Sequence, residues 1–164
     1  MSNNSVASSG RTCWTYGWLR WADEPAAFWA TLAEEAEFDE SRRRAFVTGV
    51  VWFVILQDGR IVGAAGGVPN AGGETELIGM WAAPEVRGRG FGASLVAAVC
   101  DWARGIGAST VGLWIVEGNG RARSLYEQCG FRSTGESAAL PAPHVGVEQR
   151  LQLTPRSPRD SIPV

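Results

Sequence analysis

The pattern of apolar and polar positions predicts a chain of strands interrupted by four helices. Apolar runs and loose alternation, bounded by turn residues, are typical of strands. The pair Asp58–Gly59 between two such runs is a strong signal for a two-residue hairpin turn. About seven strands are expected, at 12–19, 50–57, 60–67, 74–82, 110–116, 131–134 and 145–153.

Apolar residues spaced three and four positions apart predict the helices. Asp23 is a suitable N-cap for the first of them. The third is expected to bury Leu95, Val99 and Trp102. The expected helices cover 24–35, 39–47, 94–104 and 121–129.

This order of elements predicts an α/β protein, more closely an α+β mixed sheet with helices on both faces. The early strands pair as antiparallel hairpins, and the two central strands around the helix 94–104 are parallel through a right-handed crossover. We expect one domain over 11–153. A Ser/Asn-rich tail over 1–10 and a Pro-rich tail over 154–164 flank it.

An Arg- and Gly-rich turn connects the strand 74–82 to the helix 94–104. Glycines at a helix start let a ligand approach the backbone closely, and the N–H groups of the first helical turn have no partner within the helix. With the positive end of the helix dipole, they suit a pyrophosphate. The turn therefore predicts a site for a phosphate-bearing cofactor, formed by Arg87, Gly88, Arg89, Gly90, Phe91, Gly92 and Ala93.

The segment matches two other phosphate-binding motifs less well. Gly88-x-Gly90-x-x-Ala93 fits the dinucleotide fingerprint formally, with Glu117 at a suitable distance for a ribose contact. In that fold the strand runs straight into the first glycine, whereas here Pro84 and its neighbours intervene and other strands come first. A Walker loop is excluded because the sequence contains no lysine.

The segment resembles motif A of the GCN5-related N-acetyltransferases (GNAT), whose signature is Gln/Arg-x-x-Gly-x-Gly/Ala. Arg87-x-x-Gly90-x-Gly92 matches it. Downstream, a strand, then Asn119, a short helix with Leu125–Tyr126 and finally Gly130–Phe131 resemble motif B. Both motifs occur in the right order, and the resemblance covers about residues 11–153.

The resemblance implies an acyl-CoA N-acyltransferase fold with acetyl-CoA as co-substrate. In that fold the two central strands splay and leave a wedge for the pantetheine arm. Met80, Trp81 and Ala82 match the positions that pair with the arm, and Gly79 before them would tolerate a bulge. Asn119 matches a contact to the arm, although it also reads as a helix N-cap.

The resemblance also assigns catalytic candidates. Tyr126 occupies the position of the general acid that protonates the departing thiolate, and otherwise it is a half-buried aromatic of a helix face. Some members carry a Glu in the fifth strand, where this chain has Trp114. Glu76 in the fourth strand, with Glu74 behind it, is the better candidate base. A solvent-facing Glu76, a base-free route through water and a role for His144 stay open.

Composition restricts the partners. A formal net charge of −2 gives no electrostatic case for nucleic acid or for a membrane surface. The cysteines Cys13, Cys100 and Cys129 have no metal-like spacing and fit reduced thiols in a cytoplasmic protein. No signal peptide or membrane span is expected.

The expected function is acetyl transfer to a primary amine, of a small molecule rather than a protein. A homodimer is compatible with this function. The alternatives are a non-catalytic module that binds or senses acyl-CoA and an acetyltransferase of protein N-termini or lysines.

Overall fold

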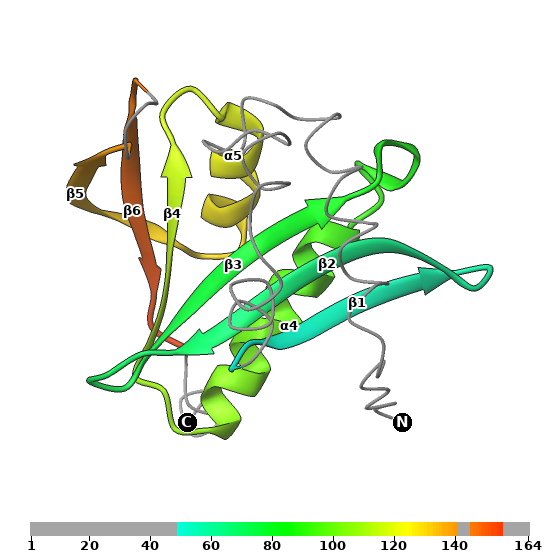
Figure 1. Ribbon diagram of the computed structural model, residues 1–164, viewed down its shortest axis with the longest axis horizontal. Helices are drawn as coiled ribbons and strands as arrows, with labels where there is room; N and C mark the ends of the chain where they lie inside the picture. Colours follow the sequence, from blue (N-terminus) through cyan, green and yellow to red (C-terminus); the bar gives the residue numbers. More distant parts are fainter. Residues whose placement is uncertain (1–48, 141–144, 156–164) are drawn as a thin grey trace, which may run out of the picture.

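Six strands form one mixed sheet in the order β1-β2-β3-β4-β6-β5 (Figure 1). The computed structural model describes residues 49–140 and 145–155. The strands are β1 (Val51–Gln57), β2 (Arg60–Pro69), β3 (Glu74–Ala82), β4 (Thr110–Val116), β5 (Arg132–Ala139) and β6 (Val147–Leu153). A 3₁₀ turn, η2 (Pro84–Val86), follows β3, and the two α-helices are α4 (Phe91–Gly105) and α5 (Gly120–Gln128).

The predicted mixed α/β class is confirmed in this part of the chain. Both described helices pack on the same face of the sheet, around one apolar cluster that contains Leu95 of α4 and Tyr126 of α5. The strand expected at 12–19, the helices expected at 24–35 and 39–47, and most of the two tails lie outside the described residues.

Local turn chemistry builds the antiparallel half of the sheet. Asp58 and Gly59 have φ values of 51° and 75°, and positive values at both central residues are what a type I′ hairpin turn requires. This turn joins β1 to β2, which pair antiparallel from Val51 to Gln57. β2 and β3 form the next antiparallel pair. The predicted hairpins are therefore confirmed.

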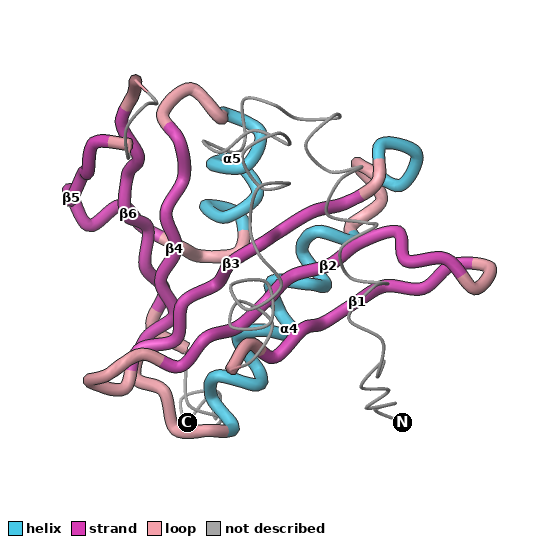
Figure 2. Tube along the Cα trace, in the orientation of Figure 1, coloured by secondary structure: helices cyan, strands magenta, loops and turns pink. Residues whose placement is uncertain are grey.

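The central strands β3 and β4 are parallel but pair only briefly. Their ladder consists of Glu74 with Thr110, Thr75 with Val111, and Glu76 with Gly112. Beyond Glu76 the two strands diverge, as Figures 1 and 2 show, and β4 continues against β6 as far as Val116. The predicted splay of the central strands is therefore present.

A β-bulge lies in β3 just before the expected arm-binding residues. Ala64 pairs with Trp81 and Gly66 pairs with Ile78, so two residues of β3 face the single Ala65 of β2. Gly79, one of the two, has a φ of 60°, a conformation that glycine adopts without steric cost. The bulge that Gly79 would tolerate is thus present, and it changes the direction of the end of β3.

Helix α4 starts at Phe91, three residues before the predicted Ser94. Gly90 is the N-cap in a left-handed conformation, and the Ser94 N–H donates to its carbonyl oxygen at 3.1 Å. The glycine turn therefore leads directly into the helix.

The strand predicted at 131–134 runs further, to Ala139. Gly135, just beyond the predicted end, has a positive φ of 84° and lies inside an irregular stretch of the ladder between Ser133 and Ser137. Beyond that stretch, β5 pairs with β6 again.

Trp102 is half-buried instead of fully buried as predicted. Its ring lies 6.4 Å from that of Phe53 and covers Gly67 of β2. A Cβ at Gly67 would stand only 2.5 Å from the Trp102 ring, so glycine here allows α4 to approach the sheet.

Replacing Gly67 by Ala should therefore destabilise the chain. We expect Gly67→Ala to lower the free energy of unfolding by about 1–3 kcal/mol through overpacking. The matched control is Gly105→Ala in the last turn of α4, where a Cβ meets open space, and it should leave stability equal or raise it by up to about 1 kcal/mol. Urea denaturation measures both, and equal stabilities for the two variants would contradict this packing.

Candidate functional site

The glycine turn before α4 presents open backbone. Gly88 and Gly90 have φ values of 74° and 83°, and a Cβ at either position would meet no atom within 4 Å. The N–H groups of Phe91, Gly92 and Ala93 precede the first bond of the helical ladder, which is donated by Ser94. The turn thus combines close access with the positive end of a helix of 15 residues.

The two arginines of the turn do different things. The Arg87 side chain folds back, and its Nε donates to the carbonyl oxygen of Ala82 at 2.9 Å. It therefore ties the turn to the end of β3. The Arg89 side chain is exposed, with its guanidinium carbon 5.7 Å from the centre of the Phe91 ring. Of the two, Arg89 places its charge at the surface of the turn.

Gly92 has a packing role that the sequence did not reveal. A Cβ at this position would lie 3.1 Å from Leu125 Cδ2 of α5 and 3.6 Å from Met80 Cε of β3. The absence of a side chain lets α4 approach both neighbours. Gly92 therefore shapes the junction of both helices with the diverging end of β3.

The last residues of β3 point to alternate faces. Met80 is half-buried and packs against the main core beneath the helices. Trp81 is buried in a second cluster with Val62, Ala83 and Val86. The three residues Met80, Trp81 and Ala82 lie beyond the last pair with β4, so this stretch of β3 is bonded to β2 but not to β4.

Asn119 caps α5, as one of its two readings predicted. Its Oδ1 accepts a hydrogen bond from the Ala122 N–H at 3.1 Å. Tyr126, two turns further, is 5% exposed and packs its ring against Phe131 with centroids 5.7 Å apart. Asn119 thus lies at the start of α5 and Tyr126 within it, where Tyr126 faces the core on the helix side of the sheet.

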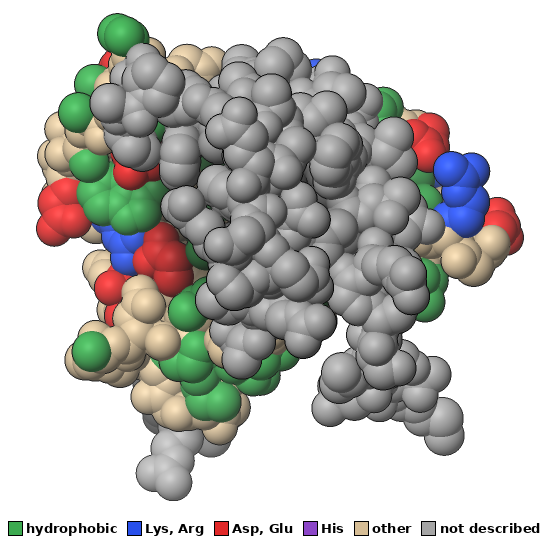
Figure 3. All heavy atoms as spheres, in the orientation of Figure 1, with side chains coloured by type: hydrophobic (Ala, Val, Ile, Leu, Met, Phe, Trp, Pro, Cys, Tyr) green, Lys and Arg blue, Asp and Glu red, His purple; other side chains and the backbone are tan. Residues whose placement is uncertain are grey.

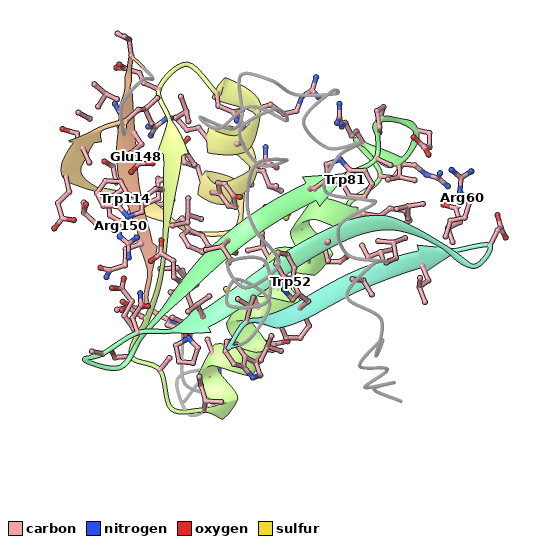
Figure 4. The ribbon with its side chains drawn as sticks, viewed as in Figure 1. Trp52, Arg60, Trp81, Trp114, Glu148 and Arg150 are labelled. Atoms are coloured by element: carbon pink, nitrogen blue, oxygen red, sulfur yellow. The ribbon has the colours of Figure 1, made fainter. Side chains whose placement is uncertain are left out.

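Glu76 lies on the opposite face of the sheet, at the last residue pair before β3 and β4 diverge. Arg150 of β6 donates from Nη1 to both of its carboxylate oxygens, at 2.6 and 2.8 Å. Nη2 of the same arginine lies 2.6 Å from Glu74 Oε1. Figure 4 shows Arg150 beside Trp114 and Glu148. Figure 3 shows acidic and basic side chains gathered on this face near apolar ones.

Burial raises the pKa of Glu76 above its usual value, and the hydrogen bonds and charge of Arg150 offset this only in part. A raised pKa brings a carboxylate closer to the range of a useful general base. Arg150 was not among the residues singled out by sequence reasoning. No local signal marks it, because Arg150 alternates with the apolar Leu151 and shares its side of the strand Val147–Leu153 with Glu148 and Gln152.

Met80, Trp81 and Ala82 lie on the stretch of β3 that has separated from β4, and the glycine turn follows that stretch along the chain. The glycine turn and Tyr126 lie on the helix side, and Glu76 lies on the opposite face. His144 lies outside the described residues. Within residues 49–140 and 145–155, no group of ligating side chains could hold a metal ion, and no helix there is long and apolar enough to span a membrane.

Solved structures share this architecture. The Salmonella typhimurium protein yncA, solved with its cofactor acetyl-CoA, is 19% identical, has a TM-score of 0.70 and covers 96% of this chain and 95% of its own. The Brucella melitensis ribosomal-protein-alanine N-acetyltransferase is 20% identical, with a TM-score of 0.69, over 90% of this chain and 96% of its own. Nourseothricin acetyltransferase is 23% identical, with a TM-score of 0.61, over 67% and 68%.

Among curated proteins no sequence matches this chain significantly. The structure agrees with setting the dinucleotide reading aside, because antiparallel strands precede β3 and the 3₁₀ turn η2 separates it from the glycine turn. A model of the acetyltransferase (GNAT) family matches residues 15–131, a span that includes the glycine turn and all of α5. Because that match covers well over half of the sequence, the chain belongs to the GNAT family of acetyltransferases.

Proposed function

We propose that this chain transfers the acetyl group of acetyl-CoA to a primary amine of a small molecule. The observation that carries the proposal is the wedge, where β3–β4 pairing stops at Glu76 and the glycine turn follows the diverging end of β3. The turn suits the pyrophosphate of the cofactor. The amides of the pantetheine arm suit the backbone of Met80, Trp81 and Ala82, which has no ladder to β4.

The reaction we propose is direct transfer. The neutral amine attacks the thioester carbonyl carbon and forms the new C–N bond, and a backbone N–H of β3 stabilises the oxyanion, which is typically worth about 2.7–4 kcal/mol. Glu76 accepts the proton that the amine loses. The C–S bond then breaks, and the thiolate takes a proton from Tyr126.

The described thiols support direct transfer over an acetyl-cysteine intermediate. Burial is the main cause that raises the pKa of Cys100 to about 11, and burial also raises the pKa of Cys129. Both thiols are therefore protonated near neutral pH, whereas nucleophilic cysteines need a lowered pKa. Both also lie in or against the main core.

The face of the sheet opposite the helices favours an acceptor amine that arrives as a cation and loses one proton to solvent before it attacks the thioester. Glu74, Glu76 and Glu148 supply three carboxylates against the single guanidinium of Arg150. Trp114 adds an aromatic ring that is 37% exposed. The neighbours' names refer to both ribosomal-protein alanine and nourseothricin, so the fold itself does not choose between protein and small-molecule acceptors.

The decisive experiment is a panel of small amines and short peptides incubated with acetyl-CoA, with thiol release as the readout. We expect turnover with one or more small cationic amines. Turnover with peptides alone would replace the small-molecule acceptor with a protein. Binding of acetyl-CoA without any turnover would show a sensing module instead.

A side chain at Gly90 should block the cofactor. Gly90→Val fills the space outside the turn and strains a backbone with φ of 83°, so we expect acetyl-CoA affinity to fall below detection in isothermal titration calorimetry. Gly107→Val is the matched control, because Gly107 has a φ of 80° and open surroundings at the other end of α4. Gly107→Val should have the same backbone strain as Gly90→Val and should bind acetyl-CoA with wild-type affinity. Equal affinities for the two folded variants would sink the assignment of the pyrophosphate site.

Removing the hydroxyl of Tyr126 tests the general acid. Tyr126→Phe keeps the ring against Phe131, so acetyl-CoA affinity should change little while kcat falls by roughly 10²–10⁴-fold. The loss should shrink with a synthetic thioester whose thiol is more acidic, because that leaving group needs less help. Turnover of Tyr126→Phe at the wild-type rate would make Tyr126 a packing residue only.

A further inference from the structure

Among the described residues, Arg150 is the one charged residue that is buried, with 6% of its surface exposed. It belongs to β6, and β4 separates β6 from β3 in the sheet. Its guanidinium nevertheless reaches across β4 and bonds carboxylates of β3, namely Glu76 through Nη1 and Glu74 through Nη2. A single arginine thus connects three adjacent strands.

Gly112 of β4 provides the passage. A Cβ at this position would stand 2.1 Å from Arg150 Nη2 and 2.5 Å from Glu74 Oε1, so any other residue would displace the pair. The guanidinium carbon also lies 5.2 Å from the centre of the Trp114 ring. Contacts with the bare backbone of Gly112 and with this ring thus restrict the orientation of Arg150.

The bridge lies where the wedge opens. Glu74 and Glu76 belong to the first and last of the three β3–β4 pairs, and the partner of Glu76 is Gly112 itself. A carboxylate has about four lone-pair positions, and Arg150 uses Glu76 through a single nitrogen. Glu76 can therefore accept a further proton or hydrogen bond while Arg150 keeps it in place.

We infer that Arg150 is a positioning residue, which holds the Glu76 carboxylate ionised and oriented at the mouth of the wedge and so sets the pH range of acetyl transfer. The inference rests on the proposed function, in which Glu76 takes the proton of the attacking amine. In this role Arg150 acts on the reaction through Glu76.

The charges around Glu76 give the inference a direction. Among the described residues, Glu74 faces it from its own strand, Arg150 and Glu148 face it from β6, and β4 contributes only the uncharged Gly112 and Trp114. Burial and the two neighbouring carboxylates raise the pKa of Glu76, while Arg150 lowers it. Removing Arg150 must raise the pKa further, and removing the charge of Glu74 must lower it.

The test compares pH profiles of kcat/KM for wild type, Arg150→Gln, Arg150→Lys and Glu74→Gln with the best amine of the panel. In Arg150→Gln the acidic limb should move to higher pH and kcat at neutral pH should fall about 10–100-fold, while acetyl-CoA affinity stays within about threefold. Arg150→Lys keeps the positive charge, so its acidic limb should lie between those of wild type and Arg150→Gln. In Glu74→Gln the limb should move to lower pH.

Both Arg150→Gln and Glu74→Gln break the same bridge, so a loss of stability alone would affect the two variants alike. Shifts of the acidic limb in opposite directions therefore show that Arg150 acts on the ionisation of Glu76. Limbs that move in the same direction, or that stay in place while both variants lose stability, would overturn the inference. Circular dichroism verifies folding, and if Arg150→Gln does not fold, Arg150→Lys and Glu74→Gln carry the comparison.

A measurement that does not depend on turnover distinguishes the proposed acetyl transfer from the inference about Arg150. The carboxyl carbon resonance of Glu76 reports its titration midpoint by NMR, and the midpoint should move in the same opposite directions. A wild-type chain that acetylates no amine contradicts the proposed function, whatever the midpoints do. An active enzyme whose kinetic limbs do not follow the NMR midpoints contradicts only the inference about Arg150.

Discussion

The arrangement of the molecule depends on one break in backbone pairing, the end of the β3–β4 ladder at Glu76 and Gly112. A parallel pair in the middle of a sheet normally continues, because buried N–H and C=O groups need partners. Here β4 follows β6 to Val116 and β3 follows β2 to Ala82, so the two strands separate without losing their other ladders. The end of β3 then has no ladder to β4, which leaves room between the strands for an extended molecule that carries amides.

Several local features maintain that break. The bulge at Gly79 turns the end of β3, and Arg87 bonds the Ala82 carbonyl, which places the glycine turn beside the strand end. Gly92 lets α4 approach α5 and β3 on the helix side. On the opposite face, Arg150 joins β6 to β3 across Gly112. The gap between β3 and β4 is thus closed at Glu76 and Gly112, where the ladder ends, and open at the other end. This shape suits an extended cofactor arm with a thioester at its inner end.

Local signals made much of this predictable. Strands β3 and β4 have the bounds that the apolar pattern predicts, because turn residues flank them. Gly73 and Pro84 flank β3, and Gly107 and Gly118 flank β4. The hairpin at Asp58–Gly59 and the bulge at Gly79 follow from positive φ, which the residue type itself indicates. The early start of α4 was missed because a left-handed glycine N-cap carries no side-chain signal.

The bridge formed by Arg150 could not be read from the sequence. It joins residues more than 70 positions apart, and it requires the order β3-β4-β6, in which the last strand inserts beside β4. A charged residue in an alternating strand reads as solvent-facing unless that order is known. Gly112 likewise reads as a weak strand residue until the guanidinium above it is seen.

Backbone hydrogen exchange with and without acetyl-CoA tests the central claim most directly, because it reads the stretch of β3 that has separated from β4. The wedge predicts that acetyl-CoA slows exchange in the segment 77–82 and in the first turn of α4, with little change in β1 or β5. Tight binding of acetyl-CoA that leaves exchange in 77–82 unchanged, or that protects another part of the sheet instead, would contradict the account.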